Sequence, residues 1–192
     1  MNDFQTKLKQ ARRREKILKA YFINRGYAVC QTEEGLSGQY KGPRIDTPDG
    51  ELIKPDLFLM KWKDDGPRVF WIDVKDKAVF TWHRITSCWC TGIDTRCYES
   101  YTALATGSGV HVFLFFLHEI STPNAIDLAY PECPKQCPTG LFLVNVMTPI
   151  NHSFKGGNNG LPMVYWAHAQ LKKIIEIKEL KEIVGEELFD DK

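Results

Sequence analysis

Two short apolar runs separated by a polar segment form the most regular pattern along the chain. Residues Leu57 to Met60 and Val69 to Ile72 are rich in the aliphatic and aromatic side chains that favour β-strands. The polar segment between them, Lys63-Asp64-Asp65-Gly66-Pro67, contains the Asp, Gly and Pro residues that form turns. The pattern therefore predicts a β-hairpin whose strands cover Glu51 to Trp62 and Pro67 to Lys77.

The register of this hairpin follows from the position of its turn. A turn centred in the polar segment places Asp56 opposite Asp73, because both residues are then equally far from the turn. Residues that are directly opposed on two strands share a face, with Cβ atoms ~5 Å apart. Period-two alternation puts Lys75 on the same face as Asp73 and turns Val74 away from it.

Apolar spacing also predicts an N-terminal helix. Ile17, Leu18, Tyr21 and Phe22 recur at three-to-four-residue spacing, and Arg25-Gly26 is a typical helix end. Residues 81 to 92 have no clear period. The other expected elements are a strand over Tyr27 to Gln31, a Gly-rich loop over Glu34 to Arg44, a helix over Thr95 to Thr106 capped by Asp94, a central strand over Val110 to Leu117, a strand over Leu141 to Met147, an edge strand over Met163 to Trp166 and a closing helix over Ala167 to Val184.

This order of elements predicts an α/β fold, with a single domain built on a central mixed β-sheet flanked by helices. We expect a core over about residues 10 to 120 and a C-terminal extension, residues 121 to 192, that adds a strand and a helix. A chain of 192 residues with 43% hydrophobic content can bury a substantial core. No apolar run reaches the ~20 residues that cross a bilayer, and the first residues lack the apolar segment of a signal peptide, so we expect a cytoplasmic protein with no membrane partner.

The pairing of Asp56 with Asp73 predicts a metal site. Two carboxylates this close repel each other unless a cation or a proton lies between them, and oxygen ligands of this kind suit Mg²⁺ or Mn²⁺. The alternative is an exposed Asp56 and a plain surface ion pair between Asp73 and Lys75. The run Val69 to Val74 has the composition of a strand covered on both faces, where a charge is costly unless it is paired or binds a metal. The metal site is therefore favoured.

The segment Pro55-Asp56, followed after residues 57 to 72 by Asp73-Val74-Lys75, resembles the motif of the PD-(D/E)xK nuclease superfamily. The resemblance runs from about residue 10 to about residue 120 and implies a restriction endonuclease-like αβββαβ core, as in restriction enzymes and Holliday junction resolvases. It implies that Asp56, Asp73 and the carbonyl oxygen of Val74 hold the metal and that Lys75 acts on the attacking water. Glu15, on the preceding helix, matches an acidic residue that completes the metal site in this superfamily.

By this resemblance we expect a Mg²⁺-dependent hydrolase, a nuclease that cleaves phosphodiester bonds in DNA. No separate target-recognition domain is evident, so an endonuclease of structure-selective or general type is expected rather than a site-specific enzyme. RNA as a substrate and a homodimeric state stay open. A hypothesis from another class also stays open: a catalytically inactive module with the nuclease fold that binds nucleic acid or a protein partner, with or without a structural zinc ion.

The distribution of charge favours a nucleic-acid contact near the N-terminus. The net charge of the chain is only +1, but residues 1 to 25 contain eight Lys and Arg against one Asp and one Glu. A basic helix of this kind, with Arg12 and Arg13, can lie along phosphates, although a solvated helix face is an equal alternative. Lys77, on the strand face of Lys75, and Arg84, beside tryptophans, are further candidates for nucleic-acid contacts, although a structural role is favoured around Arg84. The helix after the motif often contacts the substrate backbone in the resembled superfamily, which implies Tyr98 or Tyr101 as candidates; packing of the tyrosine ring under the sheet is an equal alternative.

The cysteines allow three interpretations. Cys88, Cys90, Cys133 and Cys137 together would supply four thiolates for a structural zinc ion, but their spacing departs from the usual zinc patterns. Some members of the resembled superfamily hold an iron–sulfur cluster through one early and three late cysteines, and Cys30 is an early cysteine. Buried free thiols that pack as small apolar groups are the simplest of the three and the one we favour.

Overall fold

The computed structural model describes residues 3–32, 44–48, 50–75, 77–155 and 160–189. Its helices are α1 (Asp3–Asn24), α2 (Thr95–Ser108), α3 (Ala125–Leu128) and α4 (Ile177–Val184), with 3₁₀ turns η1 (His168–Gln170) and η2 (Glu186–Leu188). Its strands are β1 (Ala28–Gln31), β2 (Arg44–Thr47), β3 (Gly50–Ile53), β4 (Leu57–Lys63), β5 (Gly66–Lys75), β6 (Thr81–His83), β7 (Cys88–Asp94), β8 (Val112–His118), β9 (Gly140–Asn145), β10 (His152–Phe154), β11 (Met163–Ala167) and β12 (Lys172–Ile175).

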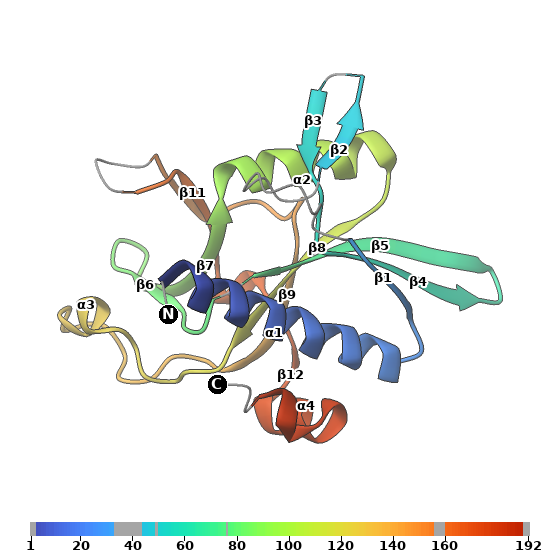
Figure 1. Cartoon of the computed structure of the whole chain (residues 1–192). Coiled ribbons are helices and arrows are strands. Elements are labelled where there is room, and N and C mark those ends of the chain that lie inside the picture. Colours follow the sequence, from blue (N-terminus) through green and yellow to red (C-terminus); the bar gives the residue numbers. More distant parts are fainter. Residues whose placement is uncertain (1–2, 33–43, 49, 76, 156–159, 190–192) are drawn as a thin grey trace.

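The strands form a large mixed sheet, a smaller sheet and a separate hairpin (Figure 1). The large sheet has the order β1-β4-β5-β8-β9-β12, in which β5 and β8 are parallel and the other neighbours are antiparallel. A parallel pair requires a crossover connection, and this connection contains α2. The chain order α1, β1, β4, β5, α2, β8 confirms the predicted fold class, a mixed sheet flanked by helices around an αβββαβ core.

The β4–β5 hairpin has the predicted register. Leu57 pairs with Ile72 at its open end, and Lys63 pairs with Gly66 at its turn. The turn therefore consists of Asp64 and Asp65. The hairpin is the long arm that extends to the right in Figure 1.

The first strand of the hairpin begins later than the sequence predicts. Strand β3 occupies the first residues of the expected strand and pairs with β2, so the predicted start at Glu51 is wrong. Pro55 accounts for the break between β3 and β4, because proline has no N–H to donate within a sheet.

The apolar stripe of α1 packs on one face of the large sheet. Ile17, Leu18, Tyr21 and Phe22 are buried, as their spacing predicts. Gly26 follows the helix with a φ of 77°, which ends the helix where expected. The sheet contributes to this core Leu57, Leu59, Ile72, Val74, Phe115 and Leu117.

The opposite face of the large sheet packs against α2. Tyr101 and Leu104 of α2 share a core with Val112 and Leu114 of β8 and with Trp166 of β11. Successive residues of β8 point to opposite faces, and both faces are covered, which explains why this strand is apolar almost throughout. The predicted cap of α2 is present, because the Asp94 side chain accepts a hydrogen bond from the Arg96 N–H.

The smaller sheet has the order β10-β11-β7-β6 and is absent from the sequence prediction. Its strands β6 and β7 come from the stretch between Thr81 and Gly92 that shows no clear period. Strand β11 lies between β10 and β7, so the prediction of an edge strand at Met163 is wrong. Trp82 and Trp89 of this sheet pack against aromatic and cysteine side chains, whereas Ile93 and Val164 pack in the core beneath α2, so no single aliphatic alternation marks its strands.

The predicted closing helix over Ala167 to Val184 is also wrong. Residues Lys172–Ile175 form β12, which pairs with β9 at the edge of the large sheet, and α4 contains only Ile177–Val184. Ile174 and Ile175 are β-branched and favour a strand. Ile175 is buried in the core beneath α1, at a position that pairing of β12 with β9 provides.

The predicted loop over Glu34 to Arg44 lies outside the described residues except for Arg44, which begins β2. The helices that the structure describes include none that is both long enough and apolar enough to cross a membrane.

Replacing Gly92 with alanine should destabilise the smaller sheet. A Cβ atom at this position would lie 2.1 Å from the carbonyl oxygen of Val164 and 2.7 Å from Cδ1 of Tyr165, so β7 and β11 would have to separate. We expect the free energy of unfolding to fall by about 2–3 kcal/mol, as in other overpacked interiors, measured by urea denaturation.

Gly107→Ala is the matched control for this substitution. No atom lies within 4 Å of a Cβ at Gly107, which is in the last turn of α2, so alanine there should stabilise the protein by up to ~1 kcal/mol. Equal stability of the two variants would contradict the close contact between β7 and β11.

Candidate active site

Asp73 is the central residue of the candidate site. It lies near the C-terminal end of β5, and its side chain is 2% exposed. Its Oδ1 accepts a hydrogen bond from the Tyr101 hydroxyl of α2. Its Oδ2 lies 2.7 Å from Nζ of Lys75 in an ion pair. A carboxylate that is almost fully buried is thus compensated by one neutral donor and one cation.

Asp56 lies one residue before β4, at the open end of the same hairpin. Its Oδ2 accepts a hydrogen bond of 2.7 Å from the Val74 N–H, so its side chain reaches across to the end of β5. Thr32 fixes the local backbone: its N–H donates to the Asp56 carbonyl oxygen at 2.9 Å, and its Oγ1 donates to the Pro55 carbonyl oxygen at 2.8 Å. The structure therefore brings the Asp56 carboxyl group to the end of β5 that carries Asp73.

The pKa of Asp56 is raised well above its ordinary value. Some surface of the residue is accessible, but its carboxyl group is surrounded by protein, and burial is the largest cause of the shift. The Asp73 carboxylate raises this pKa further and so does Glu15, whereas the Lys75 ammonium and the Val74 N–H lower it. These causes together disfavour the ionised form of Asp56 unless a further cation lies beside it.

Lys75 is held in its charged form. Burial alone would lower its pKa, but Asp73, Cys97 and Asp56 outweigh burial, and the pKa of Lys75 lies above its ordinary value. The pKa of Tyr101 is also raised, first by burial and then by Asp73, so its hydroxyl remains a hydrogen-bond donor. Near neutral pH the site therefore contains a protonated amine and a neutral phenol beside two carboxyl groups.

Glu15 approaches the site from α1 without joining the two aspartates as a third close ligand. Its Oε2 accepts a hydrogen bond from Nε2 of Gln31 at 3.3 Å, and its charge acts on Asp56. Within the residues that the structure describes, no three His, Cys, Asp or Glu side chains are grouped so that they could hold a metal. Glu15 would therefore reach a metal at this site through water.

The two aspartates nevertheless fit a divalent cation. Burial, Asp73 and Glu15 raise the pKa of Asp56, and Lys75 and the Val74 N–H do not offset them, so the carboxyl group favours a proton or a cation beside it. Oδ2 of Asp73 is buried and, among the described groups, has its ion pair with Lys75 but no hydrogen bond of good geometry. Mg²⁺ in proteins is usually held by one or two carboxylates and keeps several waters, so a pair of carboxylates suffices. The carbonyl oxygen of Val74 stays a predicted ligand.

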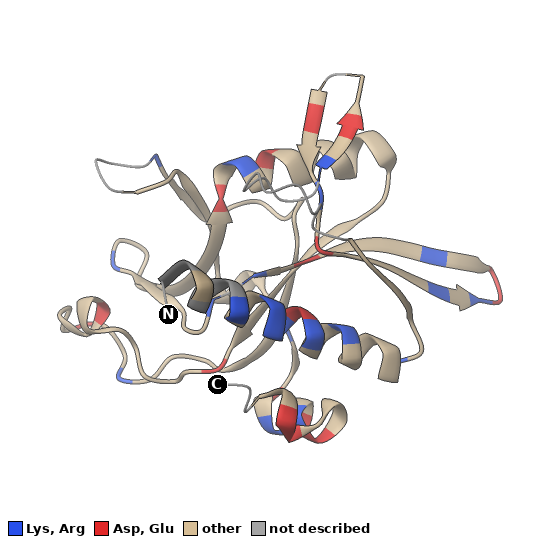
Figure 2. Cartoon of the chain, viewed as in Figure 1, with Lys and Arg blue, Asp and Glu red and all other residues tan. Residues whose placement is uncertain are grey.

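The basic residues of α1 divide between two directions. Lys9, Arg12, Lys16 and Lys19 recur at three-to-four-residue spacing, and the first three are exposed. We call these four residues the basic stripe. Figure 2 shows Lys and Arg as blue bands along α1. Arg12 therefore lies where the sequence prediction requires it, on the outer surface of the helix.

The prediction of a nucleic-acid contact for Arg13 needs correction. Its guanidinium donates a hydrogen bond to the carbonyl oxygen of Phe189 and forms an ion pair with Glu119, and its side chain is 15% exposed. Arg14 is almost fully buried and pairs with the same carboxylate. Arg13 thus fixes the C-terminal segment to α1 instead of presenting its charge to solvent.

The two candidate tyrosines of α2 pack inside the protein. Tyr101 is 1% exposed, so it does not reach a substrate, and the predicted nucleic-acid contact is wrong; its hydroxyl positions Asp73. Tyr98 is partly buried, and its ring centroid lies 5.9 Å from that of Trp166 in the core beneath α2.

The two other basic candidates, Lys77 and Arg84, lie in different parts of the fold. Lys77 follows β5 by two residues, and its pKa is lowered first by burial and then by the charge of Lys75, which places the two amines near each other. Arg84 lies in the turn between β6 and β7, where it is exposed and donates a hydrogen bond of 2.9 Å to the Tyr130 hydroxyl.

The four-thiolate zinc site predicted as an alternative does not form. Sγ of Cys88 lies 3.5 Å from Sγ of Cys90, whereas Cys133 and Cys137 are buried in an apolar core with Phe80 and other aromatic residues. Across the described part of the chain no three metal-ligating side chains meet, which also removes the iron–sulfur alternative that includes Cys30. The six cysteines are free, and the favoured interpretation of buried thiols is confirmed for Cys90, Cys133 and Cys137 but is wrong for Cys30, which is exposed, and holds only in part for the half-buried Cys88 and Cys97.

Sequence reasoning missed the residues that support the aspartates. Thr32 holds the backbone of Pro55 and Asp56, and Gln31 contacts Glu15. The signal for both was the pairing of β1 with β4, which places Gln31 opposite Leu57 and so brings the end of β1 next to the Pro-Asp segment.

No family model matches the sequence, and no curated protein matches it. Five chains of known structure match the fold. One of them is Hjc of Archaeoglobus fulgidus, a Holliday junction resolvase from an archaeal hyperthermophile, with 12% sequence identity, a TM-score of 0.46 and coverage of 88% of this chain and 97% of that chain. At this identity and TM-score, nothing about activity is taken from the similarity.

Replacing Asp56 with asparagine should stabilise the metal-free protein at alkaline pH. Because the folded pKa of Asp56 is raised, this carboxyl contributes stability below its unfolded pKa of ~3.9 and loses that contribution as the pH rises through the folded pKa. Asparagine keeps an acceptor for the Val74 N–H but carries no charge. In urea denaturation with EDTA we expect a gain at pH 8 within the ~0.5–3 kcal/mol range of single substitutions and almost none at about pH 4.

Asp64→Asn, in the exposed turn of the same hairpin, is the matched control and should change stability by less than ~0.5 kcal/mol. Added Mg²⁺ should stabilise the native protein and not the Asp56→Asn variant. If Asp56→Asn is the less stable protein at pH 8 in EDTA, the raised pKa is contradicted.

Proposed function

We propose that this protein is a nuclease that hydrolyses phosphodiester bonds in DNA with the help of Mg²⁺ or Mn²⁺. One observation supports this proposal above the others: Asp56, directly before β4, and the buried Asp73 of β5 meet at the open end of one hairpin, and Lys75 forms an ion pair with Asp73 at 2.7 Å. A structural ion pair needs only one carboxylate beside Lys75, whereas a second carboxylate next to it is what a site for a divalent cation uses.

Asp56 and Asp73 would hold the cation, with Glu15 acting through a water molecule. A bound Mg²⁺ neutralises charge on a phosphate and makes a coordinated water more acidic. Thr32 and the Val74 N–H fix Asp56, and the Tyr101 hydroxyl fixes Asp73. The two carboxylates are thus oriented before any substrate binds, which reduces the cost of reorganisation during the reaction.

Lys75 has the properties of a charged hydrogen-bond donor. Its pKa lies above the ordinary value, so its amine is protonated near neutral pH and does not take a proton from water. Its ammonium would orient the attacking water and stabilise the negative charge that develops on the phosphate. Lys77, two residues after Lys75 in the chain, would contact a neighbouring phosphate.

The basic stripe on α1 supports a nucleic-acid substrate. Four basic residues at three-to-four-residue spacing can follow a phosphate backbone, and Glu15 of the same helix acts on Asp56. The total charge is close to balanced, which favours a local contact over a protein that coats DNA. We propose a structure-selective or general DNA endonuclease. Cleavage of duplex, branched and single-stranded DNA and RNA, with and without Mg²⁺, tests the choice of substrate, and the mass of the protein in solution tests homodimer formation.

One observation favours a second candidate, a catalytically inactive module that keeps the nuclease fold. Among the described residues no third ligand joins the aspartates, and Lys75 already satisfies part of the charge of Asp73. Such a module would bind DNA in a salt-sensitive way but show no Mg²⁺-dependent cleavage. A titration of cleavage against Mg²⁺ concentration separates the two candidates.

Asp73→Asn should abolish cleavage without unfolding the protein. The amide still accepts the Tyr101 hydrogen bond but loses the ion pair with Lys75, so we expect a less stable, still folded protein that no longer provides a carboxylate for the cation. We expect the rate of plasmid nicking in Mg²⁺ to fall by about 10²-fold or more, the loss typical when one group that stabilises transition-state charge is removed.

Asp65→Asn, in the exposed turn of the hairpin, serves as the control and should nick plasmid at the native rate. Circular dichroism of both variants establishes that they are folded. Nicking by Asp73→Asn at the native rate would exclude Asp73 as a metal ligand.

Glu15→Gln should shift the pH profile of cleavage. The cation needs Asp56 in its ionised form, so activity should fall as the pH drops through the raised pKa of this residue. The Glu15 carboxylate is one cause of that raised pKa, and its removal should move the acid limb of kcat/KM modestly towards lower pH. An acid limb that stays in place or moves to higher pH would contradict the coupling between Glu15 and Asp56.

A further inference from the structure

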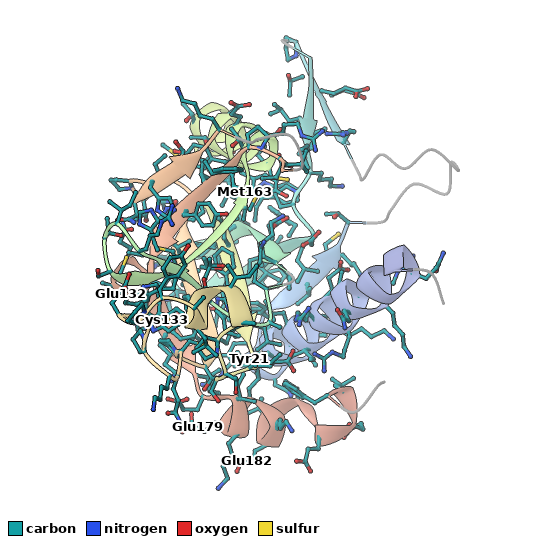
Figure 3. The ribbon with its side chains drawn as sticks, turned by 90° about the vertical axis from the view of Figure 1, so that its left-hand side faces the viewer. Tyr21, Glu132, Cys133, Met163, Glu179 and Glu182 are labelled. Carbon is teal, nitrogen blue, oxygen red and sulfur yellow. The ribbon has the colours of Figure 1, made fainter. Side chains whose placement is uncertain are left out.

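A groove of about 510 Å³ crosses the large sheet beyond the C-terminal end of α1. Its walls come from β4, β5, β8, β9 and β12 and from the last turn of the helix, on the face of the sheet that forms the core beneath α1. Tyr21 contributes to the helix side of the groove, and Figure 3 shows it where α1 meets the sheet. The volume lies within the ~300–1,000 Å³ of typical ligand sites.

The rim of the groove is strongly basic. Arg25, Lys61, Lys172 and Lys173 line it, and its lining contains no Asp or Glu. Lys173 forms an ion pair with Glu176, which leaves Arg25, Lys61 and Lys172 as the excess of positive charge at the rim, in a chain that has 25 basic and 24 acidic residues overall. Such an excess favours a negatively charged occupant.

The aromatic floor of the groove favours apolar side chains over stacked bases. Nζ of Lys61 lies 4.6 Å from the centroid of the Tyr27 ring, and the Arg25 guanidinium lies 5.4 Å from that of Tyr21, so cations already cover faces of these rings. The Tyr27 and Phe70 rings meet edge to face, with centroids 5.7 Å apart. Stacking of nucleic-acid bases requires open ring faces, whereas an aliphatic or aromatic side chain can enter between ring edges.

We propose that this groove docks an acidic segment of another protein that inserts an apolar side chain between the aromatic rings. The carboxylates of the segment would pair with Lys172, Lys61 and Arg25 at the rim. A second copy of this chain is a poor occupant, because a two-fold interface would bring this basic rim against itself.

The groove is distinct from the candidate active site. Lys61 is five residues along β4 from Asp56, which corresponds to roughly 17 Å at the usual rise of a strand. Docking would therefore leave the aspartates accessible, and this inference does not depend on the proposed nuclease activity. It adds a site through which another protein could bring this one to its substrate.

Fluorescence anisotropy with labelled acidic heptapeptides that end in pairs of Leu, Ile, Phe or Trp tests the proposal on the full chain. We expect at least one peptide to bind, and its analogue with Gln and Asn in place of Glu and Asp to bind about tenfold more weakly or worse. Lys172→Glu should weaken binding about tenfold. Lys178→Glu, an equal change of charge on an exposed position of α4, should bind as the native protein does.

Amide chemical shifts locate the bound peptide. We expect peptide-induced changes at Lys61, Leu143 and Ile174, which line the groove on three strands. The proposal is overturned if no peptide of the panel binds, if Lys172→Glu and Lys178→Glu weaken binding equally, or if single-stranded DNA binds the groove and displaces the peptide. Both substituted lysines are exposed, so the variants should fold like the native protein.

Discussion

The burial of the Asp73 carboxylate is the constraint on which the rest of this structure depends. A carboxylate that is 2% exposed costs free energy unless donors and cations surround it. Helix α2 provides the Tyr101 hydroxyl and β5 itself provides Lys75, but Asp56 adds a second acidic group next to them. The compensation is therefore incomplete without a proton or a further cation, and the proposed metal ion would supply that charge.

The same pattern that determines the fold also orients the site. Ile72 and Val74 enter the core beneath α1, so Asp73 and Lys75, which alternate with them, face towards α2. A slip of one residue in the register of β5 would bury Asp73 among the aliphatic residues of the first core and expose that strand's apolar side chains. Selection for a well-packed hairpin is therefore also selection for the correct direction of the acidic and basic groups.

Particular residues show how much of this could be read from the sequence. The hairpin register and the buried stripe of α1 depend on local periodicity, and both are predicted correctly. Of the smaller sheet only the strand at Met163 is predicted, because β6 and β7 show no clear alternation, and the short β12 is not predicted because it acquires its apolar partners only in the tertiary structure. The roles of Arg13 and Tyr101 depend on partners such as Glu119 and Asp73 that are far away in sequence, and residue type alone makes both look like surface ligands for DNA.

The two-residue turn of the β4–β5 hairpin has a consequence for the order of folding. Closing a short loop costs little entropy, so Asp56 and Asp73 can meet early, before long-range contacts with α1 and α2 are made. Their repulsion would oppose hairpin formation at that stage, but Lys75 lies on the same strand and is present from the start. The nascent hairpin thus contains its own counter-ion, and it needs no distant segment to make the meeting of two acids tolerable.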